Sequence, residues 1–454
     1  MTSTVDLDTA AIGVPLTTGP EFVYDARAPK SSRRIQMSRI RHGWLPAALL
    51  LLASSVWAQG PDIYLSTQPR RLIMSAQAMR LRVEAVLPEI GAVSISGGPA
   101  KMNAFRRIWR RQNSTMGLEG LKAVHSERLS GPSSVPVINP SSNPTVIQGN
   151  LGFATVQQFL AGLAVPMGLQ LTPITVAVLD SGVDLQHVDL QGRISPASRD
   201  FVQPGTPPSD TANGIDDDGD GVTDRAYGHG THLAGLIALA NPVADILVCR
   251  VVDDEGRGDS LRLAQAIIYA ANQGARIINL SLSLPQPSQA VVQAIHYAHD
   301  NGVMIFTSAG NGSQPLLQFP TGQDGVFTIG ATDPGPGNTQ PFFGPIAGET
   351  IAPFTNWGYT DFSVFGVDVP SLYPGNQYAY WSGTSMATAL VSATASLVLA
   401  IDPTLDDHDV KDLLKIPAVE INNLPAVYGE DPLGEGRIDL ATTILYTVFP
   451  SLIP

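Results

Sequence analysis

The sequence predicts an α/β fold in which a mainly parallel, twisted sheet lies between two layers of helices. Residues 174–179 form an unbroken apolar run between a proline and a turn, which is typical of a strand buried on both faces. Beyond residue 171, strand-like and helix-like patterns alternate, as parallel strands joined by helices require. Residues 386–400 carry only apolar or small polar side chains, which predicts a helix buried on every side.

The expected elements follow in chain order. We expect strands at residues 174–179, 246–252, 277–282, 303–307 and 326–331. We expect helices at residues 230–240, 260–273, 288–301 and 386–400. Ahead of this domain, residues 81–95 predict one or two strands and residues 104–112 a basic helix, so a small α+β segment precedes the α/β domain.

The first part of the chain predicts export. Residues 1–36 are polar and uninformative, and we interpret Met37 as the true start. From there a basic stretch, the apolar run 45–56 and a small-residue site ending at Ala58 predict a signal peptide over 37–58. The competing interpretation is an uncleaved anchor, but the run is short for a membrane span. The sequence therefore predicts a secreted protein without a stable membrane anchor.

Charge divides the exported part in two. Residues 59–130 hold 11 Lys and Arg against 5 Asp and Glu, whereas the chain from 131 onward holds 10 against 31. A basic segment can dock on an acidic domain by charge complementarity. The net charge of −13 makes nucleic acid an unlikely class of partner. Residues 131–150 are rich in Pro, Ser and Asn and predict a linker, followed by a main domain over 151–454.

One cysteine excludes an internal disulfide framework. Cys249 lies within the mostly apolar run 246–252, so we interpret it as a buried structural thiol.

Three polar residues stand at the ends of predicted elements. Asp180 follows the strand at 174–179, His229 stands between two glycines at the start of an apolar helix, and Ser385 follows a Gly-Thr turn before another. A serine at a helix N-terminus is an N-cap or a nucleophile, since free N–H groups there stabilise an oxyanion. Asp, His and Ser in this order favour a catalytic triad.

These motifs carry a family resemblance. Asp-Ser-Gly at 180–182, His-Gly-Thr-His at 229–232, Ser-Ala-Gly-Asn at 308–311 and Gly-Thr-Ser-Met-Ala at 383–387 are similar to the signatures of the subtilisin-type serine proteases, or subtilases. The resemblance runs from about residue 171 to the C-terminus and implies the three-layer subtilisin-like fold.

The resemblance also implies roles in catalysis. Ser385 would attack the peptide carbonyl, His229 would take its proton, and Asp180 would orient the imidazole. The Asn311 side chain and the Ser385 N–H would stabilise the oxyanion; for Asn311 the competing interpretation is a turn residue. His232 matches the second, non-catalytic histidine of the family.

The resemblance implies substrate contacts as well. Residues 281–283 match the strand that pairs with the substrate backbone, 308–310 a wall of the primary pocket, and Gln318 the segment that closes it. These residues are Ser281, Leu282, Ser283, Ser308, Ala309, Gly310 and Gln318. Family members often carry glycine where Ser283 and Gln318 stand, so a broad preference for large apolar side chains is in doubt.

An acidic stretch at residues 213–224 predicts a cation site. Carboxylates at alternate positions followed by glycine resemble the first part of an EF-hand-like loop, without its closing glutamate. The candidate ligands of a structural calcium ion are Asp216, Asp218, Asp220 and Asp224. The competing interpretation is a solvated acidic loop, and no organic cofactor is expected.

Together these observations predict a secreted serine endopeptidase that acts on proteins or peptides. The alternative is a peptide-binding pseudoprotease with the same fold, which the intact set of four polar residues argues against. In the family, a segment like 59–130 is a folding aid and intramolecular inhibitor. We therefore expect self-processing between about residues 129 and 151, because linkers concentrate proteolysis.

Overall fold

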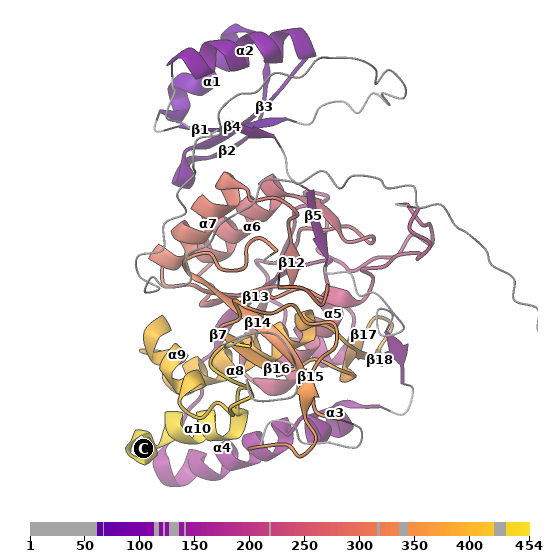
Figure 1. Cartoon of the computed structure of the whole chain (residues 1–454), viewed down its shortest axis with the longest axis vertical. Coiled ribbons are helices and arrows are strands. Elements are labelled where there is room, and N and C mark those ends of the chain that lie inside the picture. The colour runs from indigo at the N-terminus through magenta and orange to yellow at the C-terminus, as the bar shows by residue number, and fades with distance from the viewer. Residues whose placement is uncertain are drawn as a thin grey trace, which may run out of the picture. The chain divides into compact units, whose positions relative to one another are not determined.

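The computed structural model describes residues 61–66, 68–112, 118–120, 123–126, 136–139, 142–217, 219–315, 318–335, 344–421 and 433–454 (Figure 1). The predicted signal peptide at 37–58 and the stretch 1–36 lie outside these residues.

An eight-stranded sheet organises the main domain, in the order β15-β14-β13-β11-β7-β9-β8, with β16 also paired to β14. Its strands are β7 (Ile174–Asp180), β8 (Arg199–Asp200), β9 (Ala244–Arg250), β11 (Ile277–Leu280), β13 (Met304–Ser308), β14 (Val326–Asp333), β15 (Thr350–Ile351) and β16 (Phe362–Phe365). Every pairing is parallel except that of β14 with β15. The predicted mainly parallel sheet is confirmed.

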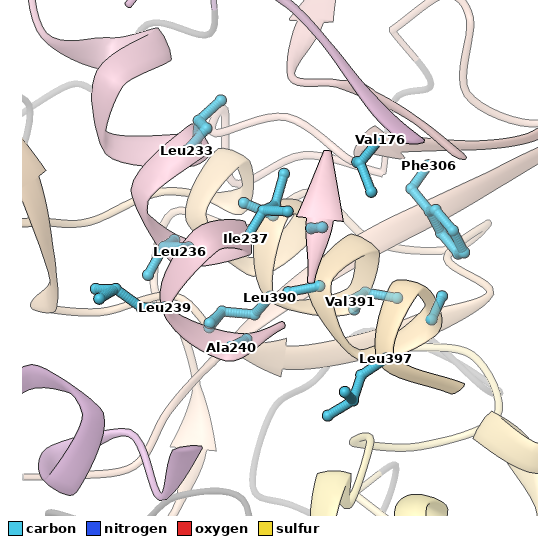
Figure 2. Close-up of a cluster of buried hydrophobic side chains, with 14 of the residues drawn as sticks. Val176, Leu233, Leu236, Ile237, Leu239, Ala240, Phe306, Leu390, Val391 and Leu397 are labelled. Atoms are coloured by element: carbon cyan, nitrogen blue, oxygen red, sulfur yellow. The ribbon is translucent and has the colours of Figure 1, made fainter. Parts of the chain in front are cut away.

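Helices cover both faces of this sheet, as expected (Figure 1). The helices α6 (Ser260–Asn272) and α7 (Gln289–Asp300) share one apolar cluster with Ala177 and Leu179. The helices α5 (His229–Ala240) and α8 (Thr384–Ile401) share another with Val176 and Val178, part of which Figure 2 shows. Successive residues of β7 thus face opposite layers, which is why the strand reads as continuously apolar.

The helix α8 is the core of the second layer. Every residue from Thr384 to Ala400 is buried. Among the described residues it is the one helix long and apolar enough to cross a membrane, but 94% of that stretch is buried inside the protein. Its composition therefore reflects a helix surrounded by protein, as the sequence predicts.

The remaining elements of the main domain are shorter or peripheral. They are β6 (Val137–Ile138), α3 (Pro144–Asn150), α4 (Phe153–Met167), β10 (Arg257–Asp259), β12 (Leu282–Ser283), β17 (Val369–Tyr373), β18 (Gln377–Trp381), α9 (Asp407–Lys415) and α10 (Leu440–Val448), with short 3-10 turns at Val188–Leu190 and Pro450–Leu452. The single strand predicted at 277–282 is wrong, because it splits at Ser281 and only β11 belongs to the main sheet.

The stretch predicted as a linker contains helix α3. Its composition favours irregular structure, but Asn143 accepts a hydrogen bond from the Val146 N–H (3.0 Å) and Pro144 occupies the first turn, which is a helix start. Ile147 anchors the helix in the core. Helix α4, which the sequence analysis did not anticipate, follows directly.

An α+β unit precedes the main domain, as predicted. Its strands are β1 (Asp62–Leu65), β2 (Arg82–Leu87), β3 (Ala92–Ser96) and β4 (Leu118–Gly120), in the antiparallel order β2-β3-β1-β4, with a 3-10 turn at Pro88–Ile90. Helices α1 (Pro69–Ala78) and α2 (Pro99–Gln112) complete it. Tyr64 packs edge-on against Phe105 and Trp109 at its core.

Apolar burial and a side-chain hydrogen bond link this unit to the main domain. Ile63, Leu87 and Ala92 belong to the apolar cluster under α6 and α7. Beyond them, Asn272 Nδ2 donates to Glu89 Oε1 (3.4 Å). Among the ion pairs formed between described residues, none joins residues 61–126 to the main domain. Docking by charge complementarity stays a prediction.

Candidate active site

Asp180 ends the central strand β7. The neighbours of β7 are β9 on one side and β11 on the other, so the strand order reverses there. In open α/β sheets such a switch point, at the carboxyl ends of the strands, is where sites are built. The Asp180 side chain is completely buried.

Asp180 and His229 form a buried pair. His229 Nδ1 donates to Asp180 Oδ1 over 2.7 Å, and the same oxygen accepts the Ser181 N–H (2.8 Å). His229 is the first residue of α5, and its ring packs edge-on against the Trp381 indole at 5.4 Å. The imidazole is thus held from two sides, by a carboxylate and by an aromatic wall.

Glycines on both sides of His229 allow this packing. A Cβ on Gly230 would lie 2.1 Å from the Gly182 carbonyl oxygen, so only glycine lets α5 start against the turn after β7. Gly228 has φ of +88°, and a Cβ there would lie 2.3 Å from the Tyr373 ring. The Gly-His-Gly motif is therefore a steric requirement of this site.

Ser385 stands at the second position of α8, beside Asn311. The Asn311 Oδ1 accepts hydrogen bonds from both the N–H and the hydroxyl of Thr384, each at 2.9 Å. These two bonds fix the orientation of the Asn311 amide. Its Nδ2 lies 3.6 Å from the position that a Cβ atom on Gly383 would occupy. The amide N–H₂ is thus held next to the turn that carries the nucleophile candidate.

A chain of buried hydrogen bonds supports the Ser385 backbone. Ser281 Oγ donates to the Ser385 carbonyl (3.3 Å), Asn279 Nδ2 donates to Ser281 Oγ (3.3 Å), and Ser392 Oγ donates to Asn279 Oδ1 (3.0 Å). The Ser385 hydroxyl is buried and has no hydrogen-bond partner in the described part of the chain. In enzymes without bound substrate, the hydrogen bond between a serine nucleophile and its base is often long or poorly aligned.

The predicted substrate strand pairs with the protein's own chain. Strand β5 (Ala123–Ser126) lies between β10 and β12 and is antiparallel to both. Opposite β12, Leu282 faces Ser126 and Ser283 faces His125. On the other side, residues 257–259 of β10 face residues 125–123. A peptide segment therefore already occupies the edge that the resemblance assigns to substrate.

The predicted pocket residues also come together. Ser308 ends β13 and its hydroxyl is buried, and Ala309 accepts a hydrogen bond from Asn356 Nδ2 (3.0 Å). The Gln318 Oε1 lies 3.0 Å from where a Cβ on Gly310 would stand. Gln318 thus lies against Gly310, where the sequence placed it.

The acidic loop, defined here as residues 213–225, is held by its own backbone and by Arg225. Asp216 accepts the N–H groups of Gly219 and Gly221 (2.7 and 3.0 Å), and Asp220 pairs with Arg225 (2.7 Å). Asp224 accepts the N–H groups of residues 213 and 214 (both 2.9 Å). Asp218 lies outside the described residues.

The described carboxylates of this loop are not placed to share one metal ion. In the described part of the chain, no group of three or more His, Cys, Asp or Glu side chains is placed to share a metal ion. To bind here, calcium would have to displace the backbone N–H groups and Arg225 from these carboxylate oxygens. Calcium binding by this loop stays a prediction.

The sequence analysis missed Asp210. Its Oδ2 accepts hydrogen bonds from the Gly228 N–H (2.9 Å) and the Thr231 hydroxyl (2.8 Å), so it ties down the first turn of α5. Its Oδ1 is buried and has no partner among the described residues. Burial raises the pKa of Asp210 to about 8. No pattern around this residue marks it in the sequence.

Two sequence assignments are borne out by burial. Burial lowers the pKa of His232 to about 3, and its Nε2 donates to the Val369 carbonyl (3.1 Å), so it is a structural histidine. Cys249 is buried, and burial raises the pKa of its thiol well above the ordinary value. A thiol that resists ionisation is inert as a nucleophile.

Comparison with known proteins identifies the class. A sequence model of the subtilase family matches residues 172–431, more than half of the chain. With the three-layer fold, this match places the protein among the serine-type endopeptidases. The chain belongs to the subtilase family.

Individual relatives agree. Subtilisin BL of Lederbergia lenta is 32% identical over 266 residues, which cover 56% of this chain and 87% of that protein. The cell wall-associated protease of Bacillus subtilis (strain 168) is 34% identical over 276 residues, covering 58% of this chain and 28% of that protein. Fervidolysin from Fervidobacterium pennivorans shares the fold, with a TM-score of 0.63 at 22% identity over 87% of this chain and 62% of that one.

Proposed function

We propose that this protein is a secreted endopeptidase that cleaves peptide bonds through an acyl-enzyme on Ser385. The observation that carries the proposal is the buried hydrogen bond of 2.7 Å between His229 Nδ1 and Asp180 at the switch point of the sheet. With Nδ1–H bound to the carboxylate, Nε2 carries the lone pair that a general base needs. Relatives that are subtilisins or cell wall-associated proteases support an extracellular location.

The chemistry follows from these positions. Ser385 Oγ attacks the carbonyl carbon as its proton passes to His229 Nε2, and the negative oxygen accepts hydrogen bonds from the Ser385 N–H and Asn311 Nδ2. His229 then gives the proton to the leaving amine, which breaks the peptide bond. Water then attacks the acyl carbon as its proton passes to His229, and His229 gives this proton to Ser385 Oγ as the carboxylic acid leaves, so that the serine is regenerated.

A fluorophosphonate probe tests this directly. It should label the wild-type protein and leave Ser385→Ala unlabelled, and casein hydrolysis should be lost in the same variant. Equal labelling of both proteins removes Ser385 from the mechanism. A wild-type protein that neither labels nor cuts casein after residues 59–130 are removed supports the peptide-binding alternative.

Substrate binding is proposed to follow the path of β5. The pairing of β5 with β10 and β12 supports β-strand addition as the way this enzyme holds an extended peptide. It also supports residues 59–130 as a pro-segment whose last strand blocks the site until it is cut. Gln318 against Gly310 favours a smaller or more polar primary side chain than a glycine at 318 would accept.

Folded structure after residue 136 narrows the range in which the processing cut is expected. Helix α3 and the β6–β18 pairing hold residues 137–138 and 144–150 in folded structure, where proteolysis is disfavoured. We therefore expect the cut between residues 129 and 135, which lie outside the described residues, at the start of the window that the sequence predicts. N-terminal sequencing should find this cut in wild type and not in Ser385→Ala. Trimming of both at the same bond assigns the cut to another enzyme.

A further inference from the structure

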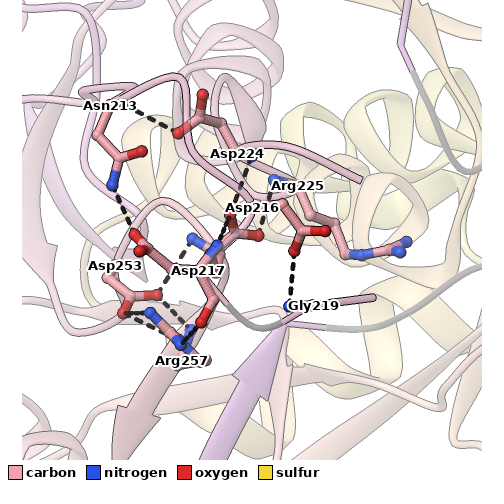
Figure 3. Close-up of polar contacts among 9 residues, drawn as sticks. Asn213, Asp216, Asp217, Gly219, Asp224, Arg225, Asp253 and Arg257 are labelled. Atoms are coloured by element: carbon pink, nitrogen blue, oxygen red, sulfur yellow. Dashed lines mark hydrogen bonds and ion pairs between the residues drawn. The ribbon is translucent and has the colours of Figure 1, made fainter. Parts of the chain in front are cut away.

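The acidic loop is joined to strand β10 by one arginine. Arg257 opens β10, and its Nε and Nη2 both donate to Asp253 Oδ2, at 3.2 and 3.1 Å. Its Nη1 donates to the Asp217 carbonyl oxygen of the acidic loop (3.1 Å). Figure 3 shows Arg257 reaching across from β10 to both groups. One planar guanidinium thus fixes three things together: the strand, the turn before it and the loop.

A second link reinforces the same connection. Glu255, in the turn between Asp253 and Arg257, is 2% exposed. Its Oε1 accepts the N–H groups of Asp217 (3.3 Å) and Asp224 (3.1 Å). The backbone of the acidic loop is therefore hydrogen-bonded to the turn that leads into β10, and this coupling restricts the movement of the turn relative to the loop.

Strand β10 needs such support because it is an edge. Within its three-stranded sheet, in the order β10-β5-β12, its one partner among the described strands is β5. Once β5 leaves, the strand keeps no ladder of its own in that sheet. Its far end is secured at Asp259, which caps α6 by accepting the N–H groups of residues 261 and 262 (both 3.0 Å). Its near end is held by the contacts of Arg257 with Asp253 and the acidic loop.

We propose that Arg257 is a positioning residue that holds β10 against the acidic loop so that extended substrates can pair with it. The inference rests on the proposed function, in which substrate takes the place of β5. Residues 123 and 124 pair with β10 alone, and Ser126 pairs with β12 alone. Because β12 leads to Ser281 beside the Ser385 backbone, β10 serves the substrate residues further from the cut bond.

Substrates of two lengths test this. Arg257→Gln should raise KM about five- to tenfold for a peptide with four or more residues before the cut bond, with kcat nearly unchanged. For an ester of a single amino acid, which does not reach β10, kcat/KM should stay within about twofold of wild type. Arg257→Lys should give an intermediate KM, because an ammonium reaches one partner but not both. Active-site titration with the fluorophosphonate sets the enzyme concentrations.

Arg262→Gln is the matched control. Arg262 and Arg257 have equal side-chain exposure, 37%, and each pairs with a nearby aspartate at 3.1–3.2 Å, but no hydrogen bond or ion pair joins Arg262 to the described residues of the acidic loop. Its partner Asp259 stays fixed by the cap on α6, so the control should behave as wild type. A long-peptide KM for Arg257→Gln within twofold of the control overturns the inference. So does an equal loss on both substrates, which would place the effect at the catalytic centre. A wild type inactive on both overturns the proposed function itself.

Discussion

Two groups of carboxylates use the same hydrogen bonds in different surroundings. Near the start of α5, Asp180 accepts a backbone N–H at 2.8 Å, and in the acidic loop Asp216 accepts one at 2.7 Å. Asp180 and Asp210 are buried, whereas Asp216 is half-buried next to solvent. In a dry interior a carboxylate depends on its few partners, while water compensates a lost partner in the loop. Burial, rather than hydrogen-bond length, separates the two groups.

The largest expected effect is at Asp180. Asp180→Asn keeps the shape but offers an N–H₂ to His229, so the imidazole loses its preferred tautomer and kcat should fall roughly 10⁴-fold. The matched change Asp216→Asn should leave kcat on a short ester within about twofold. Steady-state kinetics with titrated active sites measures both. Comparable losses from the two changes would break the distinction between the groups.

The second effect concerns Asp210 and pH. Its folded-state pKa of about 8 lies above the ordinary value of 3.8. Between these two pH values the folded protein therefore holds a proton on Asp210 that the unfolded chain has released. This contribution to stability is complete below pH 4 and is lost as the pH rises to 8, by up to about 1.4 kcal/mol per pH unit.

Asp210→Asn imitates the protonated carboxyl and should remove this slope. Urea unfolding of Ser385→Ala proteins with and without the Asn change, from pH 4 to 9, measures the difference in unfolding free energy. The unfolding free energy of the Asp210→Asn variant should increase relative to that of the parent as the pH rises. Parallel curves would mean that Asp210 is ionised in the folded protein throughout.

The smallest effect concerns the acidic loop. We expect calcium to raise the melting temperature of the Ser385→Ala protein by about 2–4 °C, since a ligand of the folded state stabilises by mass action. A variant with Asp216, Asp220 and Asp224 changed to Asn should not respond. Calcium would there replace the Arg225 pair and the N–H groups that now occupy these oxygens. An identical response of both proteins to calcium and to a chelator assigns any calcium effect to another place.

Much of the candidate site could be predicted because its residues stand where elements end. Asp180 closes an apolar strand, and His229 and Ser385 open helices whose apolar composition is plain. Such positions are readable because strand and helix patterns are local. Asp210 could not be predicted in this way, since its importance comes from contact with Gly228 and Thr231, 18 and 21 residues away.

The sequence by itself determined the fold class and the order of the motifs, because hydrophobic periodicity and element ends are properties of short stretches. The family followed from the resemblance of four short motifs to the subtilase signatures. Only the tertiary structure decided which segment lies against the predicted substrate strand, that Glu255 and Arg257 hold the acidic loop, and that Ile63, Leu87 and Ala92 share an apolar cluster with the main domain. These outcomes depend on pairings between residues far apart in the chain. Local composition does not specify such pairings, because a strand edge or a carboxylate has many partners of equal chemistry until the fold selects one.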